Sequence, residues 1–381
     1  MTAAHHAYVI EPHVAQAGGN AILSQLLADD QVEEIMYNGP RAPFLILHRQ
    51  HGACAVSAGL DEQYVWHFAQ HVASQAGARI DTNTPVFEGS LGDGSRIHIT
   101  SPPVSPHGVT FTIRKFLVRN LTIADMVGQG ALDADTAAFV WSCVDGFRAQ
   151  PMNLLVVGGT GTGKTTFLNA LTQLIPLTAR IVVIEDTQEI RVLHQNAVRL
   201  VAGPQADMDH LLRSALRMRP DRILVGEVRG AEANTLLTAM NTGHRGCLGT
   251  LHANSAKECL DRLRNAPMNV PLSQLMGIDM VLSLARIDDG QAARRVVTEI
   301  VEVSGYGEGV ARSNQLYAWN PRAQKLEPTG VPSRKRALLA RGLGWDHGKL
   351  ERAIAARASL IRSLAGTSID AAAFAAQIAV A

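Results

Sequence analysis

The chain has 381 residues, enough for two or three domains, and 46% of them are hydrophobic, enough to bury a sizeable core. Its formal net charge of +1 gives no argument for nucleic acid or an anionic membrane as a main partner. The cysteines form no CxxC pair, so we expect reduced thiols rather than disulfides or a zinc site. The first ten residues contain no Lys or Arg before an apolar run, and no apolar stretch reaches about 18 residues, so neither a secretory signal nor a membrane span is expected.

Helix and strand patterns alternate in the first part of the chain. AILSQLLADD predicts a helix, and EEIMYNGP and PFLILHR predict two strands joined by an Asn-Gly-Pro turn. Residues 61–76 have the apolar spacing of a second helix, and VFEGSL, SRIHIT and VTFTIRKF predict further strands. We therefore predict an α+β domain with a largely antiparallel sheet over residues 1–117. Residues 118–150 would then form a linker, with a short helix within 118–135, and the start of a second domain.

The pattern changes near residue 153. NLLVVGG, RIVVIED, AVRLV and RILVGE are short apolar runs that end at loops, and helical segments lie between several of them. Strands buried on both faces and linked by helices predict an α/β domain with a mostly parallel sheet, here over residues 151–329. Residues 330–381 are rich in Ala and Arg, and they predict a helical basic tail whose charges form a solvated face.

A glycine-rich segment, GGTGTGKT, matches the pattern GxxxxGK[ST] at residues 158–165. Its glycines let the backbone fold around phosphate, Lys164 is expected at the β and γ phosphates, and the Thr165 hydroxyl at magnesium. An apolar strand precedes the loop, and the helical pattern TTFLNALTQLI follows it. We therefore predict a RecA-like P-loop domain that uses ATP and Mg²⁺. The predicted nucleotide-binding residues are Gly158, Gly159, Thr160, Gly161, Thr162, Gly163, Lys164, Thr165 and Thr166.

Acidic residues at the ends of two other strands indicate hydrolysis. RILVGE ends with Glu227 in the arrangement of a Walker B acid, which can hold the magnesium hydration shell or polarise the attacking water. IVVIED ends with Glu185 and Asp186 at the carboxyl end of a parallel strand, where such sheets bind ligands. Glu185 is the candidate general base, and Glu227 is the alternative. Asp186 is a candidate nucleotide-site residue, or else a helix N-cap.

Two histidines lie in the segment GHRGCLGTLHAN. His244 and His252 are candidate sensors of the γ-phosphate, although a lone histidine is more often a satisfied core residue. The evidence for either role comes mainly from the surrounding sequence.

Taken together, these motifs resemble the traffic ATPases of type II and type IV secretion and pilus assembly. Residues 211–255 resemble the family's region from the Walker B acid to the His box, and IEDTQEIR is similar to its acidic box. GSRIHIT and FTIRKF are similar to segments that precede the motor domain. The resemblance is nearest the CpaF-like branch, associated with Tad/Flp pili, and its archaeal type IV pilus relatives. VFEGSL lacks an arginine common in the bacterial Tad branch, which favours the archaeal-like subgroup.

The resemblance implies roles for several arginines. Arg96 and Arg114 match two arginines that reach the nucleotide from the first domain, where they would neutralise charge on the transferred phosphoryl group; otherwise they are ordinary exposed strand residues. Arg217, Arg219 and Arg229 match motif arginines, some of which are expected to face the neighbouring subunit's nucleotide.

The resemblance also implies a function. It describes an ATP-hydrolysing motor that forms a homo-oligomer, expected as a hexameric ring, in the cytoplasm at the inner membrane. The motor would act on an integral inner-membrane platform protein, moving pilin or secreted substrate as its domains move about a hinge in residues 118–135. Two alternatives stay open: a nucleic-acid-translocating P-loop ATPase, supported only by the basic tail, and a P-loop kinase or regulatory nucleotide-binding module. Nucleic acid is not the expected partner.

Overall fold

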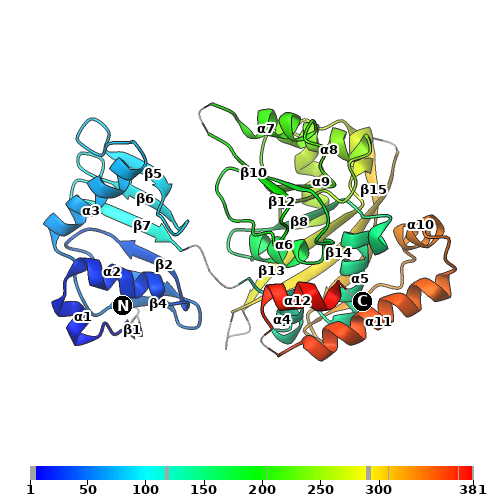
Figure 1. Cartoon of the computed structure of the whole chain (residues 1–381), viewed down its shortest axis with the longest axis horizontal. Coiled ribbons are helices and arrows are strands. Elements are labelled where there is room, and N and C mark those ends of the chain that lie inside the picture. Colours follow the sequence, from blue (N-terminus) through cyan, green and yellow to red (C-terminus); the bar gives the residue numbers. More distant parts are fainter. Residues whose placement is uncertain are drawn as a thin grey trace. The chain divides into compact units, whose positions relative to one another are not determined.

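A computed structural model describes residues 6–115, 120–203, 205–288, 293–307, 309–367 and 369–379. The chain divides into two compact units, residues 1–119 and 120–381, which are coloured along the sequence in Figure 1. Among the described residues, no helix is both long and apolar enough to cross a bilayer. We call the two units the N-terminal unit and the P-loop unit.

The N-terminal unit is built on a seven-stranded sheet in the order β1-β4-β3-β2-β7-β6-β5. Only the β1–β4 pair is parallel, so the predicted largely antiparallel sheet is confirmed. Apolar side chains of α2 and α3 pack with the inward residues of the strands in one core. The elements are β1 (His6–Tyr8), α1 (Pro12–Gln16), α2 (Gly19–Ala28), β2 (Val32–Tyr37), β3 (Phe44–His48), β4 (Gly52–Val56), α3 (Glu62–Gln75), β5 (Val86–Ser90), β6 (Arg96–Thr100) and β7 (Thr110–Arg114).

The P-loop unit is built on a nine-stranded sheet in the order β10-β9-β11-β12-β8-β13-β14-β15-β16. The pairings from β10 through β13 are parallel, which confirms the predicted mostly parallel sheet. The pairings from β13 to β16 are antiparallel, and the sequence patterns did not predict this extension. The strands are β8 (Leu154–Gly158), β9 (Ile181–Glu185), β10 (Ala197–Val201), β11 (Arg222–Val228), β12 (Leu248–His252), β13 (Met280–Asp288), β14 (Ala293–Gly307), β15 (Val310–Asn320) and β16 (Lys325–Pro328).

Helices cover both faces of this sheet, so its central strands are buried on both sides. In β8, Leu154 and Val156 face one core, and Leu155 and Val157 face the other. The first core contains residues of α4–α6 and α10–α12, and the second contains residues of α7–α9. The helices are α4 (Ile123–Gly128), α5 (Ala134–Asp145), η1 (Gly146–Arg148), α6 (Lys164–Thr172), α7 (Met208–Ala215), α8 (Glu232–Asn241), α9 (Ala256–Arg264), η2 (Leu272–Gly277), α10 (Arg334–Gly342), α11 (His347–Leu364) and α12 (Ala371–Ile378).

Two boundaries differ from the sequence-based expectation. The expected linker contains α4, whose Ile123 and Ala124 are fully buried in the core of the P-loop unit, so the hinge does not extend through residues 118–135. The C-terminal helices are present as predicted but do not form a separate tail, because α11 packs against α5. Arg357 is buried there, so at this residue the interpretation as a solvated basic face is wrong.

Candidate functional site

The phosphate-binding motif joins the end of β8 to the start of α6. Gly161 and Gly163 have φ values of +74° and +89°, a backbone region that favours glycine. Gly158 has no room for a side chain, since a Cβ there would lie 2.4 Å from Thr162 Oγ1 and 2.7 Å from the carbonyl oxygen of Leu284. Thr162 Oγ1 also donates to the Gly159 carbonyl at 2.9 Å. The loop is therefore held in one shape, with the amino end of α6 behind it.

Lys164 is the first residue of α6, and its ammonium group turns back over the loop. Its Nζ donates to the carbonyl oxygens of Gly158 at 3.0 Å and Gly159 at 2.9 Å. These contacts place a positive charge on the loop that is predicted to hold phosphate. Thr165 and Thr166 follow in the first turn of the same helix.

The carboxyl end of β12 lies beside the motif. His252 and Gly158 are register partners in the parallel β12–β8 pair. His252 Nε2 lies 3.3 Å from the Thr160 hydroxyl, and Arg262 donates to the His252 carbonyl. The structure thus places His252 against the phosphate loop, where a histidine can detect a bound phosphate.

Glu227 lies near the end of β11 and is ion-paired. Arg229 donates to Glu227 Oε2, and through its other terminal nitrogen to Asp186 Oδ2 at 2.9 Å, so it joins the ends of β11 and β9. Burial raises the pKa of Glu227, but the hydrogen bond and charge of Arg229, with further charge from Lys164 and His252, outweigh burial and hold the pKa below its ordinary value. Glu227 is therefore an ionised carboxylate within the field of the P-loop lysine.

Glu185 ends β9 in a different environment. Its side chain is buried, and its Oε1 accepts hydrogen bonds from the backbone N–H groups of Glu189 at 2.9 Å and Ile190 at 2.7 Å. Burial raises the pKa of Glu185 to about 7, although these two hydrogen bonds lower it. Gly226 permits this packing, because a Cβ there would lie 3.0 Å from Glu185 Cγ. The two candidate acids are thus held differently, one ion-paired and ionised, the other buried with a pKa near neutrality.

Three predicted nucleotide-binding residues lie at the amino ends of the parallel strands, whereas the phosphate loop lies at the carboxyl ends. Arg217 and Arg219 precede β11, and His244 precedes β12, whereas the phosphate loop follows β8. The loop before β11 is fixed at that edge, since Arg180, which precedes β9, donates to the Met218 carbonyl at 2.8 Å. The structure therefore does not bring these three side chains to the phosphate loop of their own chain. A role for them at a neighbouring subunit's nucleotide stays a prediction.

Arg96 and Arg114 belong to the N-terminal unit. They are register partners in the antiparallel β6–β7 pair, so they share one face of its sheet. The burial of both strands alternates, with Ile97, Ile99 and Ile113 inward, which leaves the arginines on the face turned away from the core. Two like charges directly opposite each other are unfavourable. Glu34, the register partner of Arg114 on β2, lies 4.0 Å from the Arg114 guanidinium group and offsets part of that repulsion.

Arg295 was not anticipated from the sequence. It lies in β14, its Nε donates to the Gly161 carbonyl at 3.1 Å, and its Cδ lies 3.2 Å from where a Gly163 Cβ would be. This guanidinium group braces the phosphate loop from the antiparallel part of the sheet. No local motif marks it, because its position depends on the register between β13 and β14.

The residues at this edge fit a magnesium ion bound together with nucleotide. The candidate ligands are oxygen atoms, which Mg²⁺ prefers, namely the Thr165 hydroxyl and the Glu227 carboxylate, whose Oε2 accepts from Arg229. Within the described ranges, no cluster of three or more His, Cys, Asp or Glu side chains could hold a metal alone. Magnesium in nucleotide sites usually takes only one or two protein ligands, the rest being phosphate oxygens and water.

Proteins of known family are similar to this chain in sequence. Residues 16–317 match the family described as "Type II/IV secretion system protein". The chain is 35% identical over 295 residues to the probable conjugal transfer protein TrbB of Sinorhizobium fredii, covering 74% of this chain and 86% of TrbB. It is 44% identical over 240 residues to uncharacterized protein MJ0781 of Methanocaldococcus jannaschii, covering 61% of this chain and 33% of that protein. The chain thus spans only a third of the length of MJ0781.

Solved structures agree on the fold. The ATPase DotB of Legionella pneumophila has a TM-score of 0.52 at 17% sequence identity, over 91% of this chain and 88% of DotB. The pilus retraction motor PilT, solved with ADP, has a TM-score of 0.51 at 16% identity, over 88% of each chain. The fold and the phosphate loop define a two-domain P-loop protein. The chain belongs to the type II/IV secretion system protein family, the traffic ATPase superfamily that its motifs resemble.

Proposed function

We propose that this chain is an ATP-hydrolysing motor subunit of a type IV pilus or of a type II-like or type IV secretion machine. The main support for the proposal is that several predicted site residues lie close together at the carboxyl ends of the parallel strands. The phosphate loop, Lys164 and His252 lie together there, and both of these side chains help to lower the pKa of Glu227. A cradle for phosphate next to a fixed carboxylate is the arrangement that phosphate transfer to water requires.

In this proposal, each side chain has a task. Lys164 and the loop N–H groups bind the β and γ phosphates, and the Thr165 hydroxyl and Glu227 hold Mg²⁺, the latter directly or through water. The metal neutralises charge on the phosphate oxygens when bound. Glu185, with a pKa of about 7, accepts the proton of the attacking water, since a base works best when its pKa lies near the working pH. The water oxygen would bond to the γ-phosphorus as the bond from that phosphorus to the bridging oxygen breaks, which yields ADP and inorganic phosphate.

Arg96 and Arg114 would complete the site from the N-terminal unit. Their shared face presents two guanidinium groups side by side, which suits the negative charge that spreads over the transferred phosphoryl group. Closure of the N-terminal unit over the nucleotide would bring them into place. Arg217, Arg219 and His244, at the far edge of the sheet, would then act on the nucleotide of the next subunit in a homo-oligomeric, hexameric ring.

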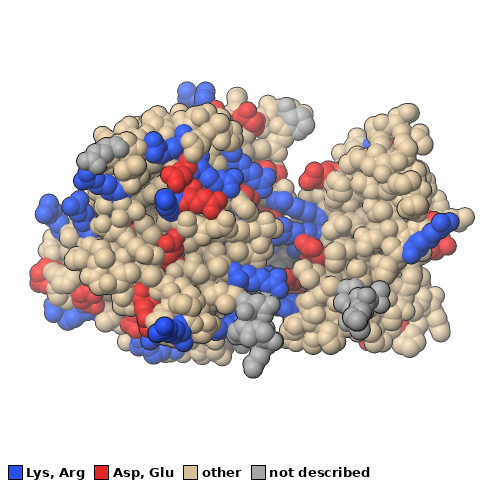
Figure 2. Space-filling model, turned by 180° about the vertical axis from the view of Figure 1, so that it is seen from behind, with Lys and Arg blue, Asp and Glu red and all other residues tan. Residues whose placement is uncertain are grey.

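The proposed partner is an integral inner-membrane platform protein, and the proposed location is the cytoplasmic face of that membrane. The motor would move pilin or secreted protein. TrbB is described as a conjugal transfer protein, and conjugation moves DNA, so a nucleic-acid motor is the second candidate. On the face shown in Figure 2, basic side chains of the P-loop unit lie among acidic ones, and the net charge is only +1, which favours a protein partner.

Phosphate release from Mg-ATP tests the proposal. Lys164→Ala should abolish turnover, because it removes the charge at the phosphates, whereas Lys257→Ala, an exposed lysine on α9, should leave the rate unchanged. Glu227→Gln should bind ATP but not hydrolyse it, because the swap keeps the shape and removes the charge. Near-wild-type phosphate release by Lys164→Ala would refute the site. Turnover that rises severalfold with added DNA would favour the nucleic-acid motor instead.

A further inference from the structure

The loop that follows β9 contacts both the phosphate-binding helix α6 and the buried acid Glu185. Asn169 lies on this helix and is half-buried, and its side-chain amide bonds two backbone groups of the loop. Its Nδ2 donates to the Glu189 carbonyl at 3.0 Å, and its Oδ1 accepts from the Arg191 N–H at 2.7 Å. One side chain thus pairs with the backbone on both sides of Ile190, as a neighbouring strand would.

The two peptide groups that flank Ile190 are also bonded at their opposite ends. The N–H of the preceding group donates to Glu185 Oε1 at 2.7 Å, and the carbonyl oxygen of the following group accepts from Arg199 on β10. A peptide group is planar and trans, so its N–H and its C=O point in opposite directions. The bond that holds the Glu189 carbonyl toward Asn169 therefore aims the Ile190 N–H at the Glu185 carboxylate.

These hydrogen bonds act on the charge of Glu185. N–H donors favour the ionised carboxylate, so the bonds from Glu189 and Ile190 lower the pKa of Glu185 and oppose the effect of burial. The charge of Arg199 also lowers this pKa, and the charge of Glu189 raises it. If the loop moved away, Glu185 would be a buried carboxyl that ionises only at a higher pH.

We propose that Asn169 is a positioning residue for Glu185, because it fixes the peptide groups on both sides of Ile190 and, through them, the hydrogen bonds to the carboxylate. Lys164 begins the same helix and lies on the phosphate loop. One rigid element would therefore hold both the phosphate loop and the acid. The inference rests on the proposed function for the role of Glu185 as base, whereas the contacts themselves do not depend on it.

Thr172 offers a matched comparison on the same helix. Its Oγ1 donates to the Arg191 carbonyl at 2.9 Å, so it also ties the helix to the loop. That carbonyl belongs to the peptide group after Arg191, which takes no part in the bonds to Glu185. Support of the loop is thus common to Thr172 and Asn169, whereas control of Glu185 would belong to Asn169.

The pH dependence of stability tests the proposal without any measurement of activity. Stability falls with rising pH while the folded protein keeps a Glu185 proton that the unfolded chain has lost, and it is constant above the folded pKa. The measured quantity is the Tm of the Glu185→Gln variant of a parent protein minus the Tm of that parent, from about pH 4.5 to 9. With the wild type as parent, this difference should level off near pH 7.

The choice of parent separates positioning from loop support. Asn169→Leu keeps the approximate size of the side chain and removes both bonds, so the Tm difference should level off about one pH unit higher or more. Thr172→Val should lower Tm, but the difference should level off at the wild-type pH. Asn169→Ala should behave as Asn169→Leu does, and it replaces that variant if the leucine does not fit.

The rate of phosphate release gives a second readout. Since kcat should rise as Glu185 ionises, the pH of half-maximal kcat should move upward by a similar amount in Asn169→Leu and stay unchanged in Thr172→Val. If only the Tm difference moves, Asn169 positions Glu185 and another group is the base. A Tm difference that levels off at the same pH in the wild type and in the Asn169 variants would overturn the proposal. Absence of phosphate release from the wild type would refute the proposed function and leave the Tm test unaffected.

Discussion

Replacing Glu185 with glutamine tests the buried acid in two independent ways. The wild-type carboxyl is buried, and its pKa is raised from 4.5 to about 7. Glutamine keeps the size of the side chain and an oxygen that can accept from the Glu189 and Ile190 N–H groups, but it carries no charge at any pH. The substitution should therefore remove the cost of ionising a buried group together with the proposed catalytic base.

The sign and size of the stability effect follow from the pKa. Between pH 4.5 and about 7 the folded protein holds a proton on Glu185 that the unfolded chain has lost, so the free energy of unfolding falls as the pH rises through this window and is constant above it. At about 1.36 kcal/mol per pH unit, the full fall is ~3 kcal/mol. For a unit of this size, that corresponds to roughly 6–12 °C in Tm.

Calorimetric melting at a series of pH values between 4.5 and 8.5 measures this effect. The Tm of Glu185→Gln minus that of the wild type should increase by roughly 6–12 °C from low to high pH. The control is Glu88→Gln, at an exposed strand glutamate, and its Tm should equal that of the wild type at every pH. Phosphate release by Glu185→Gln should be lost at all pH values. Parallel melting curves would refute the raised pKa, and retained turnover would move the role of base to Glu227.

The remaining predictions concern arginines. Arg96→Ala and Arg114→Ala should each lower kcat by about 10³ or more while Tm and ADP affinity stay near wild type; unchanged kcat in both would show that the N-terminal unit does not complete the site. Arg357→Ala leaves the Asp145 carboxylate buried without its partner and should cost about 3–5 kcal/mol of stability by thermal or urea unfolding. Arg352→Ala, exposed on the same helix, should change stability by less than about 0.5 kcal/mol, and equal losses in both variants would contradict the buried pair.

The sequence predicted β8, β9, β10 and β11 of the parallel core because each of these strands carries a local signal, whereas β12 and β13 were not predicted. NLLVVGG and RILVGE are short apolar runs that end at a loop, and the structure places β8 and β11 over them. In a parallel sheet, the residues that follow each strand lie at the carboxyl ends of the strands, on the same side of the sheet. Chain order therefore places the phosphate loop, Glu227 and His252 at one end of the sheet, and the strand order β11-β12-β8, which chain order does not determine, places them close together.

The same rule shows why three predicted residues lie elsewhere. Arg217, Arg219 and His244 precede their strands, and position relative to the strand assigns them to the amino edge. The resemblance to a family matched the motif but carried no information on which edge the residues occupy, or on which subunit they serve. Counting whether a residue comes before or after its strand would have separated them from the phosphate site.

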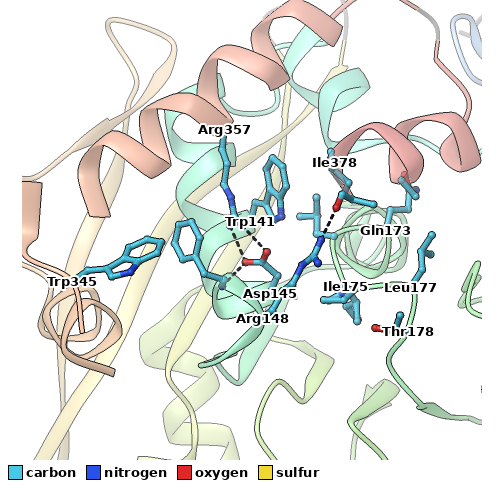
Figure 3. Close-up of a pocket in the computed structure, with 15 residues that line it drawn as sticks. Trp141, Asp145, Arg148, Gln173, Ile175, Leu177, Thr178, Trp345, Arg357 and Ile378 are labelled. Atoms are coloured by element: carbon cyan, nitrogen blue, oxygen red, sulfur yellow. Dashed lines mark hydrogen bonds and ion pairs between the residues drawn. The ribbon is translucent and has the colours of Figure 1, made fainter. Parts of the chain in front are cut away.

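Local sequence patterns could not predict contacts between segments that are far apart in the chain. Arg357 lies 212 residues from Asp145 in the sequence, and a helix rich in Ala and Arg gives no sign that one arginine is buried. The pair matters because ionised groups are buried only with a partner, so α11 is bound to α5 at a specific register rather than by apolar contact alone. Asp145 also fixes the turn that carries Arg148. The C-terminal helices therefore form part of the wall of a cavity beside this turn, through Arg357 of α11 and Ile378 of α12 (Figure 3).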